Sequence, residues 1–400
     1  YAIGYREGSP HRSRFFGFFS LCVSATLGLA LAGNLFTFFI FYELLTLATY
    51  PLVAHRGTPE ATRAGQIYLG YTLAGGLALL TGMVWLQQLT GTVEFTPGGV
   101  LTADAASPAA LTLIFALLVG GLGVKAALVP LHGWLPIAMV APAPVSALLH
   151  AVAVVKAGAF GIVRVVEEVF GMGLFTALGL GPPLAALAAV TILYGSFRAL
   201  FQDELKRRLA YSTVSQVAYI TLGVALGGTT AAIGGLVHLV HQGIMKITLF
   251  FCAGAIAETL HVHRVSQMAG LGRRMPWTMT AFTVGALGMV GAPPTAGFIT
   301  KWYLGLGALE AGAGWVVAVL AASSLLNAAY FLPILYTAWF RAPAAPWPER
   351  RHRFEAHWML LAPPLSTAVL TLLLGLLAQT PFSALRWAHL IVSREFGTWL

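Results

Sequence analysis

Apolar stretches of about 20 residues recur along the whole chain, and each is long enough to cross the hydrocarbon core of a bilayer as an α-helix. The composition agrees, because 58% of the residues are hydrophobic and only 9% are charged, whereas soluble domains carry about a quarter charged residues. A bilayer core offers the backbone no water, so such segments must bond internally as helices. The sequence therefore predicts an all-α polytopic membrane protein.

Eleven transmembrane helices are predicted, two of them broken. The fourth passes through a glycine-rich stretch into Pro130, and the ninth is interrupted by Gly291 and by Pro293 and Pro294. Proline removes a backbone donor, and a broken helix persists in a membrane only where protein or water satisfies the freed groups. The spans are placed at 15–33, 35–53, 65–89, 109–129, 144–166, 174–198, 209–227, 231–257, 277–309, 312–340 and 357–378.

The positive charges favour this topology. Only Arg164, Arg386 and Arg394 fall on one side of the predicted bundle, and positive residues favour the cytoplasm. The N-terminal stretch and the segment FQDELKRRLAYS are therefore predicted to be cytoplasmic. The pI near 9.8 reflects these topology-setting charges and not nucleic-acid binding, since no basic run is long enough to bind a phosphate backbone. The opposite side receives Arg6, Arg12, Arg14, Arg56, Arg63, Arg198, Lys206, Arg207, Arg208, Arg264, Arg273, Arg274, Arg341, Arg350, Arg351 and Arg353.

The spans form two blocks. Residues 1–14 are a polar lead-in, 15–166 a first five-helix repeat, 174–340 a second repeat inverted relative to the first, and 341–400 a loop, a last span and a tail. The fourth helix of each block is broken and carries a lysine. The tail is expected to be a surface helix or truncated, and because the chain begins at Tyr1 we expect an N-terminal segment to be missing.

Four of the five lysines lie inside apolar spans, whereas none of the eighteen arginines lies mid-span. A lysine can lose its proton when protein removes it from water, but an arginine stays charged. The four lysines inside the spans therefore predict a proton relay rather than a set of permanent charges. The four are Lys125, Lys156, Lys246 and Lys301.

Glu43 is the only carboxylate in mid-span, and Lys125 is its expected partner. His150 lies on the span of Lys156. His238 and Lys246 recur with Gln242 at spacings of four, along one helical face. These groups are the predicted proton-transfer residues, connected by water.

Structural roles are the alternative for these residues. A lysine near a helix end can extend to the membrane interface, and this alternative applies first to Lys301. A lone histidine can be a packing residue, and Glu43 can belong to a structural ion pair. His241, His261 and His263 are expected to be surface groups at a helix end. Cys22 and Cys252 show no disulfide or thiolate spacing, so no metal or cofactor site is predicted.

At these residues the sequence resembles the antiporter-like subunits of Mrp-type cation/proton antiporters, respiratory complex I (subunits L, M and N) and membrane-bound hydrogenases. The carrying segments are 124–158, 205–220, 238–256 and 291–302, with NLFTFFIFYELLTLATYPLV around Glu43. The segment HQGIMKITLFFCAGAI is most similar to the D subunit of Mrp-type antiporters.

The resemblance implies a fourteen-helix subunit with two inverted bundles, of which the first three helices are absent. It assigns Glu43 to the family's essential glutamate, Lys125 and Lys301 to the lysines on the broken helices, Lys156 to the lysine between them and Lys246 to the central lysine. The family commonly has histidine where this chain has Gln242, and glutamine orders water but takes up no proton.

The hypothesis is a proton-translocating subunit of a multisubunit Na⁺ or K⁺/proton antiporter in the prokaryotic inner membrane, assembled with other membrane subunits. The alternative is a proton-pumping subunit of an NADH-quinone oxidoreductase or membrane-bound hydrogenase, so whether the chain serves an enzyme stays open. A third class, an intramembrane enzyme, would need paired carboxylates or a nucleophile, and the single mid-span carboxylate argues against it.

Overall fold

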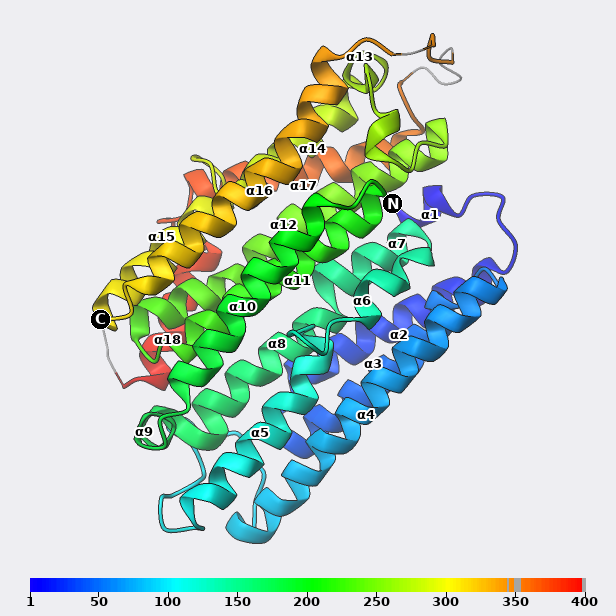
Figure 1. The fold of residues 1–400 in the computed structure, drawn as a ribbon. Helices are drawn as coiled ribbons and strands as arrows, with labels where there is room; N and C mark the ends of the chain where they lie inside the picture. Colours follow the sequence, from blue (N-terminus) through cyan, green and yellow to red (C-terminus); the bar gives the residue numbers. More distant parts are fainter. Residues whose placement is uncertain (344, 349–353, 398–400) are drawn as a thin grey trace.

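The computed structural model describes residues 1–343, 345–348 and 354–397, and helices dominate it. Figure 1 shows the long helices side by side, with α2–α5 on one flank, α14–α17 on the other and α8, α11 and α12 between them. The main helices are α2 (Arg12–Ala30), α3 (Leu35–Val53), α4 (Pro59–Thr90), α5 (Pro108–Lys125), α8 (Val154–Arg164), α10 (Gly181–Leu200), α11 (Leu205–Ala225), α12 (Thr229–Leu260), α14 (Pro276–Val290), α15 (Ala296–Glu310), α16 (Trp315–Phe340), α17 (Trp358–Leu376) and α18 (Ala384–Glu395).

Within the described residues, nine helical segments are long and apolar enough to cross a membrane. Two of the eleven predicted spans do not meet that test, each for a physical reason. The span at 209–227 is α11, which is buried on nearly all sides and therefore carries polar residues inside the bundle. The span at 277–309 is divided into α14 and α15, each too short alone.

Other predicted boundaries shift. The helix predicted at 144–166 continues as one segment, Ala143–Ala177, through two π-helical stretches, η2 (Leu148–Val152) and η3 (Val165–Phe170). Its extension takes residues that were predicted to start the sixth span, which begins as α10 at Gly181. The tail contains α18, whose first turn is capped by the Ser383 hydroxyl accepting from the Arg386 amide at 3.1 Å.

Glycine sets the spacing of α4 and α5. A Cβ added at Gly75 would lie 2.9 Å from the Gly121 carbonyl oxygen, and one added at Gly121 would lie 2.7 Å from the Leu79 nitrogen. Small residues let membrane helices approach closely, and this contact holds the first broken helix against α4.

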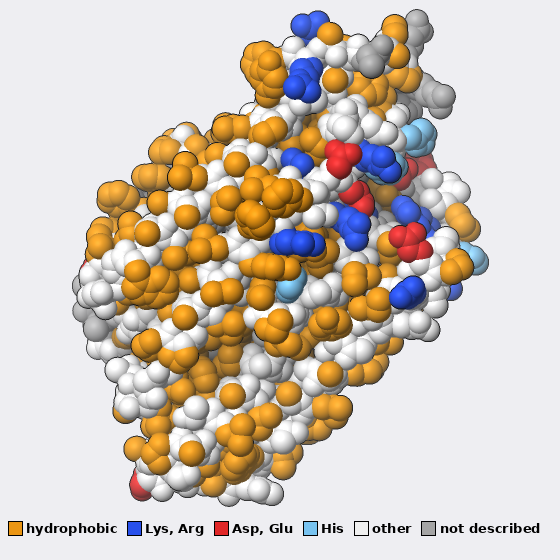
Figure 2. Space-filling model, viewed as in Figure 1, with side chains coloured by type: hydrophobic (Ala, Val, Ile, Leu, Met, Phe, Trp, Pro, Cys, Tyr) orange, Lys and Arg blue, Asp and Glu red, His pale blue; other side chains and the backbone are white. Residues whose placement is uncertain are grey.

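Positive side chains gather at one end of the face in Figure 2. This end has a hollow of about 590 Å³ between α4, α11, α12 and the short segment α6 (Trp134–Ile137), which we call the basic hollow. Of the residues predicted for the basic side, Arg350, Arg351 and Arg353 lie outside the described part of the chain. The division into two inverted repeats stays a prediction.

Candidate functional site

The first broken helix ends at Lys125, and protein groups satisfy the backbone that the break frees. The Trp134 indole donates to the Val124 carbonyl at 2.7 Å, and the Val129 amide donates to the Thr191 hydroxyl at 3.1 Å. Ala127 takes a left-handed φ of 56° in the turn between them. The surrounding protein therefore stabilises the break, which places Lys125 at the end of α5, inside the bundle.

Lys125 is completely buried, and its ammonium binds Tyr42 of α3 in two ways. It donates to the Tyr42 carbonyl oxygen and lies 3.2 Å from the centroid of the Tyr42 ring. The Tyr42 hydroxyl in turn donates to the Gly121 carbonyl at 3.1 Å. A carbonyl and the negative face of an aromatic ring both favour the charged amine, so α3 supplies the immediate surroundings of Lys125.

Glu43 follows Tyr42 on α3, and its charge interacts with that of Lys125, the predicted partner, without a hydrogen bond between them. Among the described residues, neither carboxylate oxygen of Glu43 has a hydrogen-bond partner, although both are buried. The carboxylate packs on α4, since a Cβ added at Gly76 would lie 2.9 Å from Glu43 Cδ. Lys125, at the end of α5, instead donates to the carbonyl of Tyr42, the residue that precedes Glu43 on α3.

His150 and Lys156 lie on the helix that follows the first break. His150 is in the π-helical stretch η2, with its ring centroid 4.9 Å from that of Phe250, and Lys156 is in α8. No described group hydrogen-bonds the two His150 ring nitrogens or Lys156 Nζ. Lys156 also lines a mostly apolar groove of about 340 Å³ between α2, α8 and α12.

The centre of the molecule contains buried polar side chains from α11 and α12. The His238 ring lies 5.2 Å from the Tyr219 ring, and neither His238 nor Gln242 hydrogen-bonds any described group. His241 corrects a prediction: it is buried rather than on the surface, and its Nδ1 lies 3.2 Å from the Thr300 hydroxyl of α15. The side chain of Gln216 on α11 has no described partner either.

Lys246, in contrast, belongs to a continuous hydrogen-bond network. Its ammonium donates to the Ser212 hydroxyl at 2.6 Å, and the Tyr330 hydroxyl lies 2.7 Å from the same oxygen. Tyr330 also donates to Asn327 Oδ1 at 2.7 Å, and Asn327 Nδ2 donates to the Met289 carbonyl at 2.9 Å. The network thus crosses from α12 through α11 and α16 to the last turn of α14.

Lys301 lies beyond the second break and caps the helix before it. Its ammonium donates to the Val290 carbonyl at 2.6 Å, the Met289 carbonyl at 3.3 Å and the Ser324 hydroxyl at 2.7 Å. A cation at the carboxyl end of a helix satisfies free carbonyls and favours the helix dipole. Met289 therefore accepts from both Asn327 and Lys301, which joins Lys301 to the network of Lys246.

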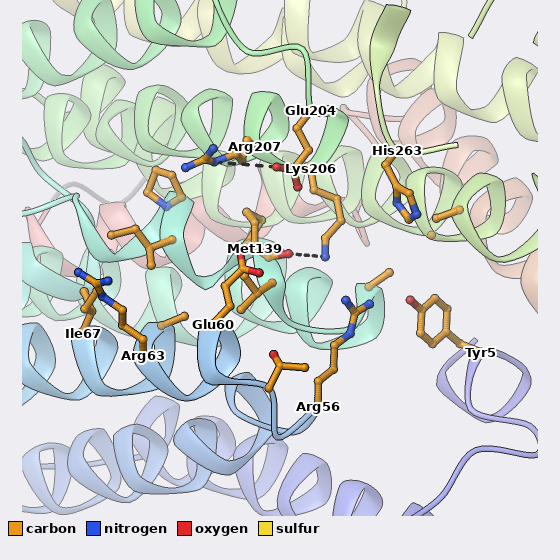
Figure 3. A pocket seen from close by; sticks show the side chains of 18 residues that line it. Tyr5, Arg56, Glu60, Arg63, Ile67, Met139, Glu204, Lys206, Arg207 and His263 are labelled. Carbon is orange, nitrogen blue, oxygen red and sulfur yellow. Dashed lines mark hydrogen bonds and ion pairs between the residues drawn. The ribbon is translucent and has the colours of Figure 1, made fainter. Parts of the chain in front are cut away.

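The basic hollow lies at the end of the molecule where α4 and α11 begin and α12 ends. Figure 3 shows Arg56 and Lys206 pointing toward each other across it. Lys206 donates to the carbonyls of Met139 and Ala141, each at 2.6 Å. Arg207 and Glu204 form a loose ion pair of 4.0 Å on its rim. The lining of the hollow mixes charged and apolar side chains and includes Gly254, on the same helix as Lys246.

The predicted residues therefore form two kinds of site. Glu43, His150, Lys156 and His238 are buried without bonded partners among the described residues, whereas Lys125, Lys246 and Lys301 are held by carbonyls or hydroxyls. Sequence reasoning missed Tyr42, Ser212, Asn327 and Tyr330. Their signal is weak but present, because a serine and an asparagine inside apolar spans are costly unless bonded.

The chain is similar to known membrane proteins over most of its length. Residues 32–327 match a family described as NADH:quinone oxidoreductase/Mrp antiporter, transmembrane. NADH-quinone oxidoreductase subunit N of Desulforudis audaxviator is 38% identical over 94% of this chain and 77% of that protein. A probable K⁺/H⁺ antiporter protein of Rhizobium meliloti is 32% identical over 99% of this chain, which spans 40% of that relative's length.

Among solved structures, a chain of the Mrp complex from Dietzia sp. is similar with a TM-score of 0.85 and 28% identity, covering 95% of this chain and 77% of that one. The family match over 32–327 includes both broken helices and all four lysines predicted inside the spans. The helical membrane fold predicted from the sequence is confirmed.

Proposed function

The chain belongs to the NADH:quinone oxidoreductase/Mrp antiporter transmembrane family, and we propose that it translocates protons as a subunit of a multisubunit Na⁺ or K⁺/proton antiporter. It is an antiporter-like, multi-pass membrane subunit. The observation that carries the proposal is the hydrogen-bonded connection from Lys246 to Lys301, within one bundle that also buries Glu43, Lys125, His150, Lys156 and His238.

The proposed route uses the two kinds of site differently. Protons pass from Glu43 and Lys125 to Lys156, then through His150 and His238 to Lys246, and finally to Lys301. Water supplies the contacts for the groups that lack described protein partners, because buried polar groups are costly when unbonded. A proton arriving on one lysine repels the charge on the next, and this repulsion is strong in an interior of low dielectric constant.

Antiporter membership is compatible with the structural similarity to a chain of the Mrp complex, although a chain of an archaeal respiratory membrane complex matches this protein with the same TM-score of 0.85. A second candidate is the proton-pumping subunit of an NADH-quinone oxidoreductase or hydrogenase complex. The 38% identity with subunit N, over 77% of that protein, favours it. In both candidates the chain lies among other membrane subunits, in a prokaryotic inner membrane with its basic end in the cytoplasm.

Inverted membrane vesicles carrying the whole complex test the proposal. A pH-sensitive dye follows proton movement as Na⁺, K⁺ and NADH are added in turn, with wild type and Lys125→Ala compared. A proton flux triggered by a cation and lost in the variant is expected, and it names the ion. A flux that only NADH triggers contradicts the antiporter assignment and selects the second candidate.

A further inference from the structure

The network between Lys246 and Lys301 contains one side chain that cannot pass on a proton. Ser212, Tyr330 and Asn327 are all buried, so bulk solvent does not compete for their hydrogen bonds. Each link from Lys246 to the Met289 carbonyl is 2.9 Å or shorter. Each hydroxyl and amide hydrogen in this network can therefore be assigned to an acceptor within the network.

The count gives the network a direction. The Tyr330 hydroxyl lies 2.7 Å from both the Ser212 oxygen and Asn327 Oδ1, and its single hydrogen can be donated to only one of them. When Tyr330 donates to Asn327, Ser212, which accepts from Lys246, donates its own hydrogen to the Tyr330 oxygen. This arrangement uses every hydroxyl hydrogen, whereas the reverse arrangement leaves the Ser212 hydrogen without an acceptor among these groups. A hydroxyl can accept and donate at one oxygen, so Ser212 and Tyr330 are competent relay groups.

Asn327 ends the relay. Its amide accepts at Oδ1 and donates at a different atom, Nδ2, which is committed to the Met289 carbonyl at 2.9 Å. The same Oδ1 lies 3.4 Å from the Ser196 hydroxyl, so a second donor also holds the amide. On the other side, Lys301 reaches Met289 as a donor. Two donors therefore meet at one carbonyl, and no proton passes between them.

We propose that Asn327 is a positioning residue that keeps the proton connection between Lys246 and Lys301 interrupted until its side chain turns away from Tyr330. This inference rests on the proposed function. When the amide turns, the Lys246 ammonium gives a proton to Ser212, Ser212 gives its own to Tyr330, and Tyr330 gives its own through a water molecule to the Lys301 amine. Lys246 becomes neutral, Lys301 becomes charged, and each hydroxyl and the water keep their original number of hydrogens.

The interruption has a clear use. An uninterrupted hydrogen-bonded path between Lys246 and Lys301 would let protons move down their gradient without transport of the coupled ion. An amide held by Met289 of α14, Ser196 of α10 and Tyr330 makes passage depend on a rotation of the Asn327 side chain that breaks these bonds. Coupling then requires a movement rather than a mere difference in proton concentration.

The test measures passive proton leak in vesicles that carry the whole complex, after an imposed pH gradient and without added cation or NADH. Asn327→Ser places at this position a hydroxyl that both accepts and donates, and we expect leak to rise at least about threefold. Asn327→Thr supplies the same chemistry if the serine variant does not assemble. Ala329→Ser adds a hydroxyl at an exposed position of the same helix, away from the network; it is the control and is expected to leak like wild type.

The double variant Asn327→Ser with Tyr330→Phe decides the mechanism. Loss of the tyrosine hydroxyl removes the relay, so leak is expected to return to the wild-type level. The proposal is overturned if neither Asn327→Ser nor Asn327→Thr raises the proton leak. It is also overturned if the raised leak persists in the double variant, because the leak would then come from damage to the helix bundle and not from the tyrosine relay. Because an imposed gradient drives the leak, this result is separate from the proposed function, which fails only if wild type shows no coupled proton flux.

Discussion

The two broken helices hold their lysines in opposite ways. Lys125 is the last residue before its break and finds its partners on a different helix, at the carbonyl and ring of Tyr42. Lys301 lies after its break and binds the carbonyls of the helix that the break ends. The first lysine is therefore fixed by packing between α3 and α5, whereas the second is fixed by the local geometry of the break itself. The two predicted repeats therefore do not share these contacts.

The same contrast extends to the regions around them. Glu43, His150 and Lys156 have no bonded protein partner among the described residues, whereas Lys246 and Lys301 share a network of hydroxyl, amide and carbonyl groups. Protein side chains can specify a route only where they bond one another. The first region therefore depends on hydration, and the second on side-chain positions.

The largest effect is expected from Lys125→Ala. Removing the ammonium at the first break should lower coupled proton flux by about 100-fold or more, a size typical of a lost acid–base group. Dye-based flux in vesicles with equal amounts of assembled complex measures it. Arg63→Ala removes a positive charge from the rim of the basic hollow and serves as the control. Equal losses in both variants would mean that general charge, not the site, matters.

Stability should separate the bonded lysine from the unbonded one. Lys301→Met breaks three hydrogen bonds from a charged donor and leaves the Val290 carbonyl of α14 free, so the complex should lose about 1–3 kcal/mol of unfolding free energy. Lys156→Met removes an amine that has no described partner and should leave stability unchanged or higher. Thermal unfolding of the purified complex compares them. A greater loss in Lys156→Met would contradict the comparison.

Gly76→Ala probes the unbonded carboxylate without removing it. The new methyl group would meet Glu43 Oε1, so the carboxylate must move away from α4 and coupled flux should fall several-fold. Gly70→Ala on the same helix meets no atom within 4 Å and is the matched control. If the two variants carry equal flux, the position of Glu43 against α4 is unimportant.

The smallest effect concerns pH and lies outside the spans. Burial, and then the charges of Arg6, Arg14 and His11, lower the pKa of His55 from 6.5 to about 4. Its Nε2 lies 2.8 Å from Arg6 Nη2, so the neutral ring accepts.

The neutral ring stabilises the fold fully above pH 6.5, and this contribution is lost as pH falls toward 4. His55→Gln should therefore reduce the fall in melting temperature between about pH 7 and about pH 5. An unchanged pH dependence would count against this assignment.

Much of the fold followed from the sequence because the bilayer imposes it. Hydropathy located nine of the predicted spans, and proline with glycine located both breaks, since backbone groups in a membrane have few ways to be satisfied. The span predicted at 209–227 is found as the helix α11, which is surrounded by protein and is therefore less apolar than the nine segments that meet the membrane-span test. The prediction failed at His241, where the hydrophilic residue type suggested the surface.

The sequence by itself determined which groups are available for proton transfer: four lysines, one glutamate and two histidines inside apolar helices, an arrangement too costly in a membrane without a use. Only the tertiary structure decided how they are connected. It bonded Lys125 to the carbonyl of Tyr42, the residue before Glu43, and it joined Lys246 to Lys301 through Ser212, Tyr330 and Asn327. Hydrogen bonds depend on a few tenths of an ångström between side chains from several different helices, and no spacing along one chain encodes that distance.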